Sequence, residues 1–318
     1  MQLFIVLLGA TLGFIYSYNT DGFIFSSNIC LFAGLTMIMP SLFKVRLSDV
    51  KLVWEYRITI IKSLFLNFVL LPVFAVIIGL ITRDYGIAAG IFLLSVLSGG
   101  GMVMYWIKKS GGDTSLGFII LFINLLLVSL SFLMLHLFGI YTESYFSTLY
   151  TEDANNMSSY ARLVVMLLIV IPFVTSRVII LIKPLAAFIE TYRTYISNAS
   201  IFVILFYLFG LQSTQSLVDI FDLEPELAAI SLVAVIVFYL LDLLAARFMF
   251  NLDSPQEKAA FWHSATRYIT LALVLSTFSM KAFGVSMLLP IMFAYLIQIP
   301  FAILLDKKLE QNDKQLQV

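Results

Sequence analysis

The chain has 318 residues, of which 61% are hydrophobic and only 12% are charged, against about 45–50% and about 25% in a typical globular protein. Its mean hydropathy is +1.01, so it carries more apolar surface than one soluble core can bury. Basic and acidic residues number 19 each, and this balance gives no indication of a nucleic-acid partner. The composition predicts an all-α membrane protein that crosses the bilayer many times.

Long apolar runs define the expected spans, since a helix needs about 20 apolar residues to cross about 30 Å of hydrocarbon. We predict ten transmembrane helices, at 2–17, 23–43, 59–82, 86–107, 116–138, 162–182, 196–212, 227–247, 257–279 and 284–305. The runs are longer and more uniformly apolar than barrel strands. The stretch after Met1 lacks a basic region and a clear cleavage site, so it is taken as the first span.

The distribution of basic residues between the loops predicts the orientation of the chain. One side has only Arg83, Arg162 and Lys281. The opposite side has 14 basic residues: Lys44, Arg46, Lys51, Arg57, Lys108, Lys109, Arg177, Lys183, Arg193, Arg247, Lys258, Lys307, Lys308 and Lys314. We therefore expect a multi-pass protein of the cell inner (plasma) membrane with both termini in the cytoplasm.

A polar segment at 139–161 divides the chain into two halves of five spans. The predicted organisation is a first five-helix repeat (1–138), an extracytoplasmic connecting loop (139–161), a second repeat (162–305) and a cytoplasmic tail (306–318). An odd number of spans in each half makes any repeat between them inverted in the membrane, as in many secondary transporters.

The fourth predicted span of each half is interrupted. The first interruption contains Ser98, Gly99, Gly100 and Gly101, and each glycine costs a helix about 1 kcal/mol relative to alanine. The second is a polar block from Trp262 to Tyr268. Unwound backbone at membrane depth must be buried in protein or line a cavity, and paired interruptions of this kind indicate a binding site. The alternative is that the glycines only allow close helix packing.

Arg267 lies inside the second interruption, where an ionised side chain needs a cavity or a partner. One interpretation is that Arg267, with His263 one turn earlier, binds an anionic solute; the other is a structural ion pair with Asp242. His263 is either a proton carrier or a core histidine with satisfied hydrogen bonds. The other candidate solute-binding residues are Ser264, Thr266, Thr270, Asn67 and Asn124. Each isolated amide, including Gln298, has helix bridging as its alternative role.

The sequence contains no catalytic motif. Paired carboxylates within a span, a metalloprotease histidine pair, a nucleophile elbow and a phosphate-binding loop are all missing. The single cysteine, Cys30, excludes an internal disulfide and a cysteine-built metal site. We expect neither an enzyme nor a cofactor.

Several segments resemble the bile acid:sodium symporter superfamily, which includes the arsenite efflux permeases, and the resemblance covers about 30–305. The segments are Gly34–Arg46, Leu64–Pro72, Gly101–Trp106 with Gly112-Asp113 and then Asn124, and Ser264–Leu273. The chain looks like a divergent prokaryotic-type member. The resemblance implies two inverted five-helix repeats, broken fourth and ninth helices that cross near the midplane, and a core group of helices that moves against a panel group.

The chain departs from the family at its functional positions. The cysteine of the arsenite permeases matches Gly99, and their ninth-helix glutamate matches Thr270. The positions that hold sodium in the bile acid carriers match Asn67, Val103, Met104, Gly117, Leu121 and His263, with Arg267 in place of a glutamine. Hard cations require oxygen ligands, and of these side chains only Asn67 supplies one. We therefore expect the usual sodium sites to be lost.

The expected function is secondary transport of a small organic anion by alternating access, coupled to H⁺ or not coupled. The resemblance keeps Na⁺ coupling as an alternative. In this hypothesis Arg267 holds the anion and backbone amides near Gly99–Gly101 complete the site. Two other hypotheses remain: efflux of arsenite or a related oxyacid without the usual cysteine, and a non-transporting membrane scaffold or sensor.

Overall fold

A computed structural model describes residues 2–24, 26, 29, 32, 36, 50–100, 103–150, 166, 170–211 and 225–315. Within these ranges every regular element is a helix, as the composition predicts. Most of the predicted second span, Cys30, the Gly34–Arg46 segment apart from Thr36, Gly101 and the start of the predicted sixth span lie outside the described residues.

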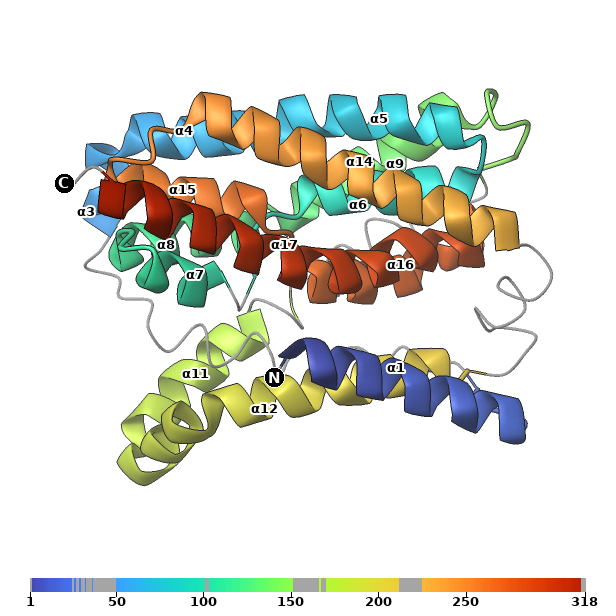
Figure 1. Cartoon of the computed structure of the whole chain (residues 1–318). Coiled ribbons are helices and arrows are strands. Elements are labelled where there is room, and N and C mark those ends of the chain that lie inside the picture. Colours follow the sequence, from blue (N-terminus) through green and yellow to red (C-terminus); the bar gives the residue numbers. More distant parts are fainter. Residues whose placement is uncertain are drawn as a thin grey trace.

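Three helices form one side of the molecule in Figure 1. They are α1 (Gln2–Asn19), α11 (Ile171–Leu181) and α12 (Lys183–Phe209). The other side contains α3 (Val50–Glu55), α4 (Arg57–Phe65), η2 (Leu66–Leu70), α5 (Leu71–Thr82), α6 (Tyr85–Val96), α7 (Val103–Lys109), α8 (Thr114–Leu126), α9 (Val128–Thr142), α14 (Pro225–Met249), α15 (Pro255–Ala265), α16 (Ile269–Phe283), η5 (Val285–Met287) and α17 (Leu288–Gln315).

Small residues allow α1 to pack closely along α12. A Cβ atom added at Gly13 would lie 2.5 Å from the carbonyl oxygen of Phe206, and one added at Gly9 would lie 3.1 Å from that of Phe202. Two glycines four residues apart on one helix face permit this approach of the two backbones. The pair α1–α12 therefore depends on glycine at Gly13 most of all.

Three described helices are long and apolar enough to cross a membrane, namely Arg57–Thr82, Pro225–Met249 and Val285–Lys307. The pair α8–α9 provides a fourth span if it is counted as one, although it bends by 48° between its two helices. Shorter apolar helices include α6 and α11. These elements indicate a multi-pass membrane protein, and the number of ten spans stays a prediction.

Two predicted spans differ in shape from the observed helices. The predicted span at 116–138 is the bent pair α8–α9. The predicted span at 196–212 is the end of α12, a helix of 27 residues that has Pro184 near its first position. The charged residues in its sequence do not stop the helix, because the backbone hydrogen bonds of a helix do not depend on the charge of the side chains.

The helix that carries Asn67 changes its winding at that residue. Residues Leu66–Leu70 form a π turn between α4 and α5, and the N–H of Leu71 donates to the carbonyl of Leu66. Pro72 follows, and its ring has no N–H and crowds the preceding turn. A π turn accommodates such a residue and re-aims the side chains around it.

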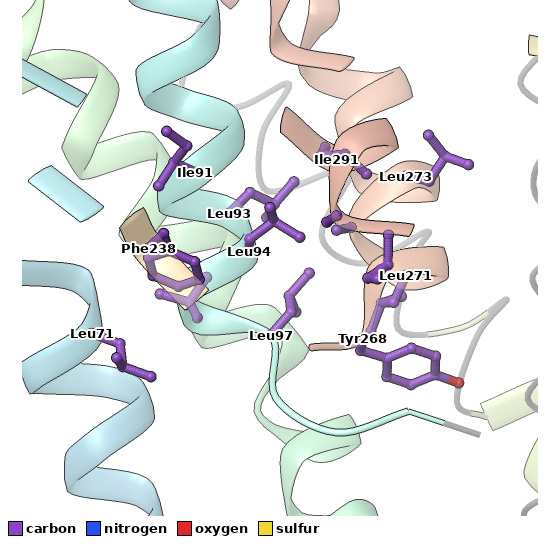
Figure 2. Close-up of a cluster of buried hydrophobic side chains, with 14 of the residues drawn as sticks. Leu71, Ile91, Leu93, Leu94, Leu97, Phe238, Tyr268, Leu271, Leu273 and Ile291 are labelled. Carbon is purple, nitrogen blue, oxygen red and sulfur yellow. The ribbon is translucent and has the colours of Figure 1, made fainter. Parts of the chain in front are cut away.

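The two predicted interruptions are present in the structure. The first helix ends at Val96 and resumes at Val103, and the second ends at Ala265 and resumes at Ile269. Figure 2 shows buried apolar side chains around the breaks. They include Leu71, Ile91, Leu93, Leu94, Leu97, Phe238, Tyr268, Leu271, Leu273 and Ile291. The breaks therefore lie in the core of the molecule.

Candidate functional site

The two helix breaks lie side by side and hydrogen-bond to each other. The N–H of Gly99 donates to the carbonyl of Thr266 at 2.8 Å, and the N–H of Tyr268 donates to the carbonyl of Leu97 at 3.1 Å. Ser98 and Arg267 form an antiparallel bridge between these bonds. Backbone groups freed from the helices thus find partners inside the protein, as buried backbone groups generally do.

Gly99 is placed where only glycine fits. Its φ is +60°, and an added Cβ atom would lie 2.2 Å from Nδ1 of His263. The ring of His263 is therefore packed directly against the first break. Nε2 of His263 lies 2.7 Å from the carbonyl of Gly117, so this nitrogen carries the proton that the carbonyl accepts.

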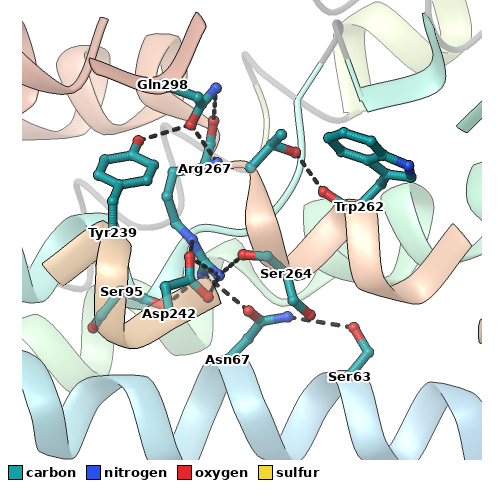
Figure 3. A network of polar contacts seen from close by, with 10 residues as sticks. Ser63, Asn67, Ser95, Tyr239, Asp242, Trp262, Ser264, Arg267 and Gln298 are labelled. Atoms are coloured by element: carbon teal, nitrogen blue, oxygen red, sulfur yellow. Dashed lines mark hydrogen bonds and ion pairs between the residues drawn. The ribbon is translucent and has the colours of Figure 1, made fainter. Parts of the chain in front are cut away.

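Arg267 is fully enclosed by protein, with 1% of its surface exposed. Its guanidinium group forms a bidentate ion pair with Asp242 of α14: Nε donates to Oδ2 and Nη2 donates to Oδ1, each at 3.0 Å. Figure 3 shows the two side chains facing each other. The ion pair that the sequence offers as an alternative for Arg267 is therefore present in the structure.

The remaining guanidinium donors also have partners within the protein. Nη1 donates to Oδ1 of Asn67 at 2.9 Å and to the carbonyl of Ser95 at 3.2 Å. Nη2 donates to the carbonyl of Ser264. All five N–H groups of an arginine are thus engaged. Direct contact between Arg267 and an anion stays a prediction, and it requires that one of these bonds be exchanged.

The two carbonyl acceptors occupy equivalent places in their helices. Ser95 is one residue before the end of α6, and Ser264 is one residue before the end of α15. The C-terminal end of a helix carries partial negative charge, which stabilises a nearby cation. The guanidinium therefore meets two helix ends and one carboxylate.

The backbone of Arg267 is held by Gln298 of α17. The N–H of Arg267 donates to Oε1 of Gln298 at 2.6 Å, and Nε2 of Gln298 lies 3.3 Å from the carbonyl of Arg267. The hydroxyl of Tyr239 donates to the same Oε1 at 2.7 Å. Gln298 therefore bridges helices, which is one of the roles that the sequence allows for it (Figure 3).

Several buried polar atoms near the breaks have no hydrogen-bond partner. They are Oγ of Ser98, Oγ of Ser264 and Nδ1 of His263; the side-chain amide of Asn124, in α8, also lacks a partner. Since a buried polar group without a partner costs about 1–3 kcal/mol, the atoms at the breaks are candidates for contact with a further polar molecule.

The other predicted site residues have partners of their own. The hydroxyl of Thr266 donates to the carbonyl of Trp262 at 2.6 Å, and the hydroxyls of Thr270 and Tyr295 are 2.6 Å apart. Asn67 contacts Arg267 through Oδ1, and its Nδ2 lies 3.4 Å from Oγ of Ser63. A Cβ atom added at Gly100 would lie 3.3 Å from the ring of Tyr268.

Outside this network, further contacts connect the two broken helices to each other and to neighbouring helices. The rings of Trp106 in α7 and Trp262 in α15 stack with centroids 5.5 Å apart, and Nε1 of Trp262 donates to Oγ of Ser110 at 2.8 Å. Lys62 pairs with Glu257 at 2.7 Å, and Lys109 pairs with Asp306. The described residues contain no group of three or more His, Cys, Asp or Glu side chains that could hold a metal ion.

Residues 29–218 match a family model described as the sodium bile acid symporter family. The chain belongs to this family. The matched region includes the first break, Asn67 and Asn124, whereas Asp242, the second break and Gln298 follow it. Family membership confirms the resemblance of the sequence and identifies the chain as a member of a transporter family. A comparison with curated proteins gave no match.

Proposed function

We propose that the chain is a secondary transporter of a small organic anion, which it binds at the paired helix breaks and moves by alternating access. One observation carries this proposal: Ser98, Ser264 and His263 bring buried polar atoms without partners to the breaks. Proteins rarely leave such atoms unpaired. The oxygens of an anionic solute would accept hydrogen bonds from the hydroxyls of Ser98 and Ser264, whereas Nδ1 of His263 carries no proton and would need a donor. Family membership supports transport, since this family consists of transporters.

The helix boundaries support an inverted repeat. We compare the two halves by adding the separation between Ser98 and Arg267 to each residue number of the first half. Ser95 then corresponds to Ser264, and the bounds of α6 correspond to those of α15 within one residue. The same shift brings Arg57–Thr82 to Pro225–Met249 within two residues. The shift also maps Gly99 to Tyr268 and Leu97 to Thr266, so it converts each of the two backbone hydrogen bonds between the breaks into the other. A local two-fold axis would relate the two bonds in the same way.

The geometry favours an anion through the start of α16. This helix of 15 residues begins at Ile269, directly after the bridge, and the first turn of a helix presents N–H groups without helical partners and partial positive charge. Arg267 and Asp242 offset each other's charge. In this proposal Arg267 therefore fixes the position of the breaks, and the anion binds beside it.

The two sides of the molecule suggest the moving parts. The helices α1, α11 and α12 would form a panel, and the helices that carry the breaks would form the core that moves against it (Figure 1).

The excess of basic residues in alternate loops supports a cytoplasmic location for both termini. The described side chains at the matched sodium positions, apart from Asn67, supply no oxygen ligand, which supports transport without Na⁺ at the usual sites.

The test is solute flux into proteoliposomes that contain the purified protein. Small carboxylates, sulfonates, bile salts and arsenite are compared with and without a Na⁺ gradient. We expect uptake of one carboxylate or sulfonate that does not depend on Na⁺. Uptake of arsenite alone would support the oxyacid permease, and folded protein without any flux would support the scaffold or sensor.

Serine variants locate the site. Ser98→Ala and Ser264→Ala should weaken solute binding about tenfold each, because each removes a hydrogen bond of about 1–1.5 kcal/mol. They should leave the unfolding temperature unchanged, since neither hydroxyl has a partner in the protein. Ser276→Ala is the matched control, because its buried hydroxyl donates to the carbonyl of Leu273 within α16. If all three variants bind the solute as tightly as the unmodified protein does, the solute binds elsewhere.

A further inference from the structure

The guanidinium of Arg267 sits in a shell of five oxygen atoms. Two belong to the carboxylate of Asp242, one is Oδ1 of Asn67, and two are the carbonyl oxygens of Ser95 and Ser264. Each of these residues is buried. Carboxylate, amide and carbonyl oxygens are the ligands of hard cations, and the ends of broken helices supply such carbonyls to cations in transporters.

The charge of this shell requires one cation. Asp242 brings a full negative charge, and the ends of α6 and α15 add partial negative charge. Among the described residues that contact the shell, Arg267 is the one positive side chain. A buried carboxylate without a counter-charge is strongly unfavourable unless it takes up a proton, so an ionised Asp242 depends on a positive charge at this position.

We propose that this shell is a binding site for a small monovalent cation and that the protein fills it permanently with its own side chain. Arg267 belongs to the second break, and its guanidinium group fills the shell. The group therefore lies between the ends of both broken helices. Shortening Arg267 should open the shell to a free cation. Guanidinium itself matches the present oxygen arrangement, and Na⁺ requires the oxygens to move inward.

A tethered cation has a consequence for transport. A free ion can be taken up on one side of the membrane and released on the other, which couples solute movement to its gradient. The guanidinium cannot leave, so a Na⁺ gradient supplies no energy at this position. This consequence rests on the proposed transport function, whereas the cation site itself does not.

The test uses Arg267→Ala, purified in detergent in choline chloride and then titrated with Na⁺, K⁺ or millimolar guanidinium while thermal unfolding is followed. No solute or transport assay is needed, so its outcome is separate from that of the proposed function. A cation that binds only the folded state raises the melting temperature. We expect a saturating rise of several degrees with guanidinium or Na⁺ in the variant and no rise in the unmodified protein.

Two further variants make the result decisive. The double variant R267A/D242N lacks the charge of the shell and should show no cation-dependent rise. Arg267→Gln also removes the positive charge with a longer side chain, and it should show the same dependence as Arg267→Ala. An absence of any cation effect, an equal effect in the double variant, or failure of both single variants to fold even with these cations present would overturn the proposal.

Discussion

The carbonyl oxygens of Ser95 and Ser264 accept hydrogen bonds from the same guanidinium group, that of Arg267. Each serine is one residue before the end of a broken helix. A single side chain therefore ties two helix ends that are far apart in the sequence, and the backbone bridge at Ser98 ties the segments that follow them. The breaks form one structural unit.

Replacing Asp242 should destabilise the protein strongly. Asp242→Asn removes the charge that balances the buried Arg267, and breaking a buried pair in this way costs about 3–5 kcal/mol. Thermal unfolding in detergent measures the loss. Asp253→Asn is the matched control, because Asp253 is exposed and surface substitutions change stability by about 0.5 kcal/mol or less. Similar melting temperatures for the two variants would contradict the role given to the ion pair.

Gly99→Ala should be more damaging than Gly111→Ala. Both glycines have a positive φ, +60° and +73°, so both variants carry the strain of a left-handed residue, about 1–2 kcal/mol. Only at Gly99 does the new methyl group meet a neighbour, Nδ1 of His263 at 2.2 Å, whereas nothing lies within 4 Å at Gly111. Comparison of the two unfolding temperatures separates the steric effect from the strain, and equal losses would show that His263 moves away freely.

Gln298→Ala should destabilise the second break by about 2–3 kcal/mol. The substitution leaves the N–H and carbonyl of Arg267 and the hydroxyl of Tyr239 without this partner, and each lost hydrogen bond in a buried site costs about 1 kcal/mol or more. Tyr239→Phe removes only one of the three bonds and should cost about 1 kcal/mol. If Tyr239→Phe is as damaging as Gln298→Ala, the contact with the backbone of Arg267 contributes little.

Gly13→Ala should weaken the packing of α1 on α12 more than Gly9→Ala. The new Cβ atom would lie 2.5 Å from the carbonyl oxygen of Phe206 in the first variant and 3.1 Å from that of Phe202 in the second. Overpacking of this kind costs about 1–3 kcal/mol. Limited proteolysis combined with thermal unfolding would report it, and the reverse order of the two variants would be inconsistent with the observed helix contact.

The helix breaks could be predicted from the sequence because the residues at the breaks are of types that rarely occur inside a membrane-spanning helix. Consecutive glycines and a polar block are unusual within apolar spans, and Asp242 stands out as an acid within another such span. The shell around Arg267 could not be predicted in full. Two of its oxygens belong to the main chain of Ser95 and Ser264, and carbonyl groups are the same in every residue.

The shapes of the helices are harder to predict than their positions. Hydropathy locates apolar residues, but it does not distinguish a polar helix from a loop, so the sequence predicts a connection where the first half of α12 lies. The bend between α8 and α9 has no proline or glycine at Leu127 to indicate it. The role of Tyr239 depends on the distance from Gln298, which only the folded chain defines.

The bridge between Ser98 and Arg267 also imposes an order on biosynthesis. Ser95 and Asn67 emerge from the ribosome long before Arg267, and at about 5–20 residues per second the interval is roughly ten to forty seconds. During that time Leu97 and Gly99 lack the backbone partners that the second break supplies, and Asn67 lacks the guanidinium group that it contacts. The two backbone hydrogen bonds between the breaks therefore form only after the second break has been synthesised, so the core around the first break is completed by residues of the second half.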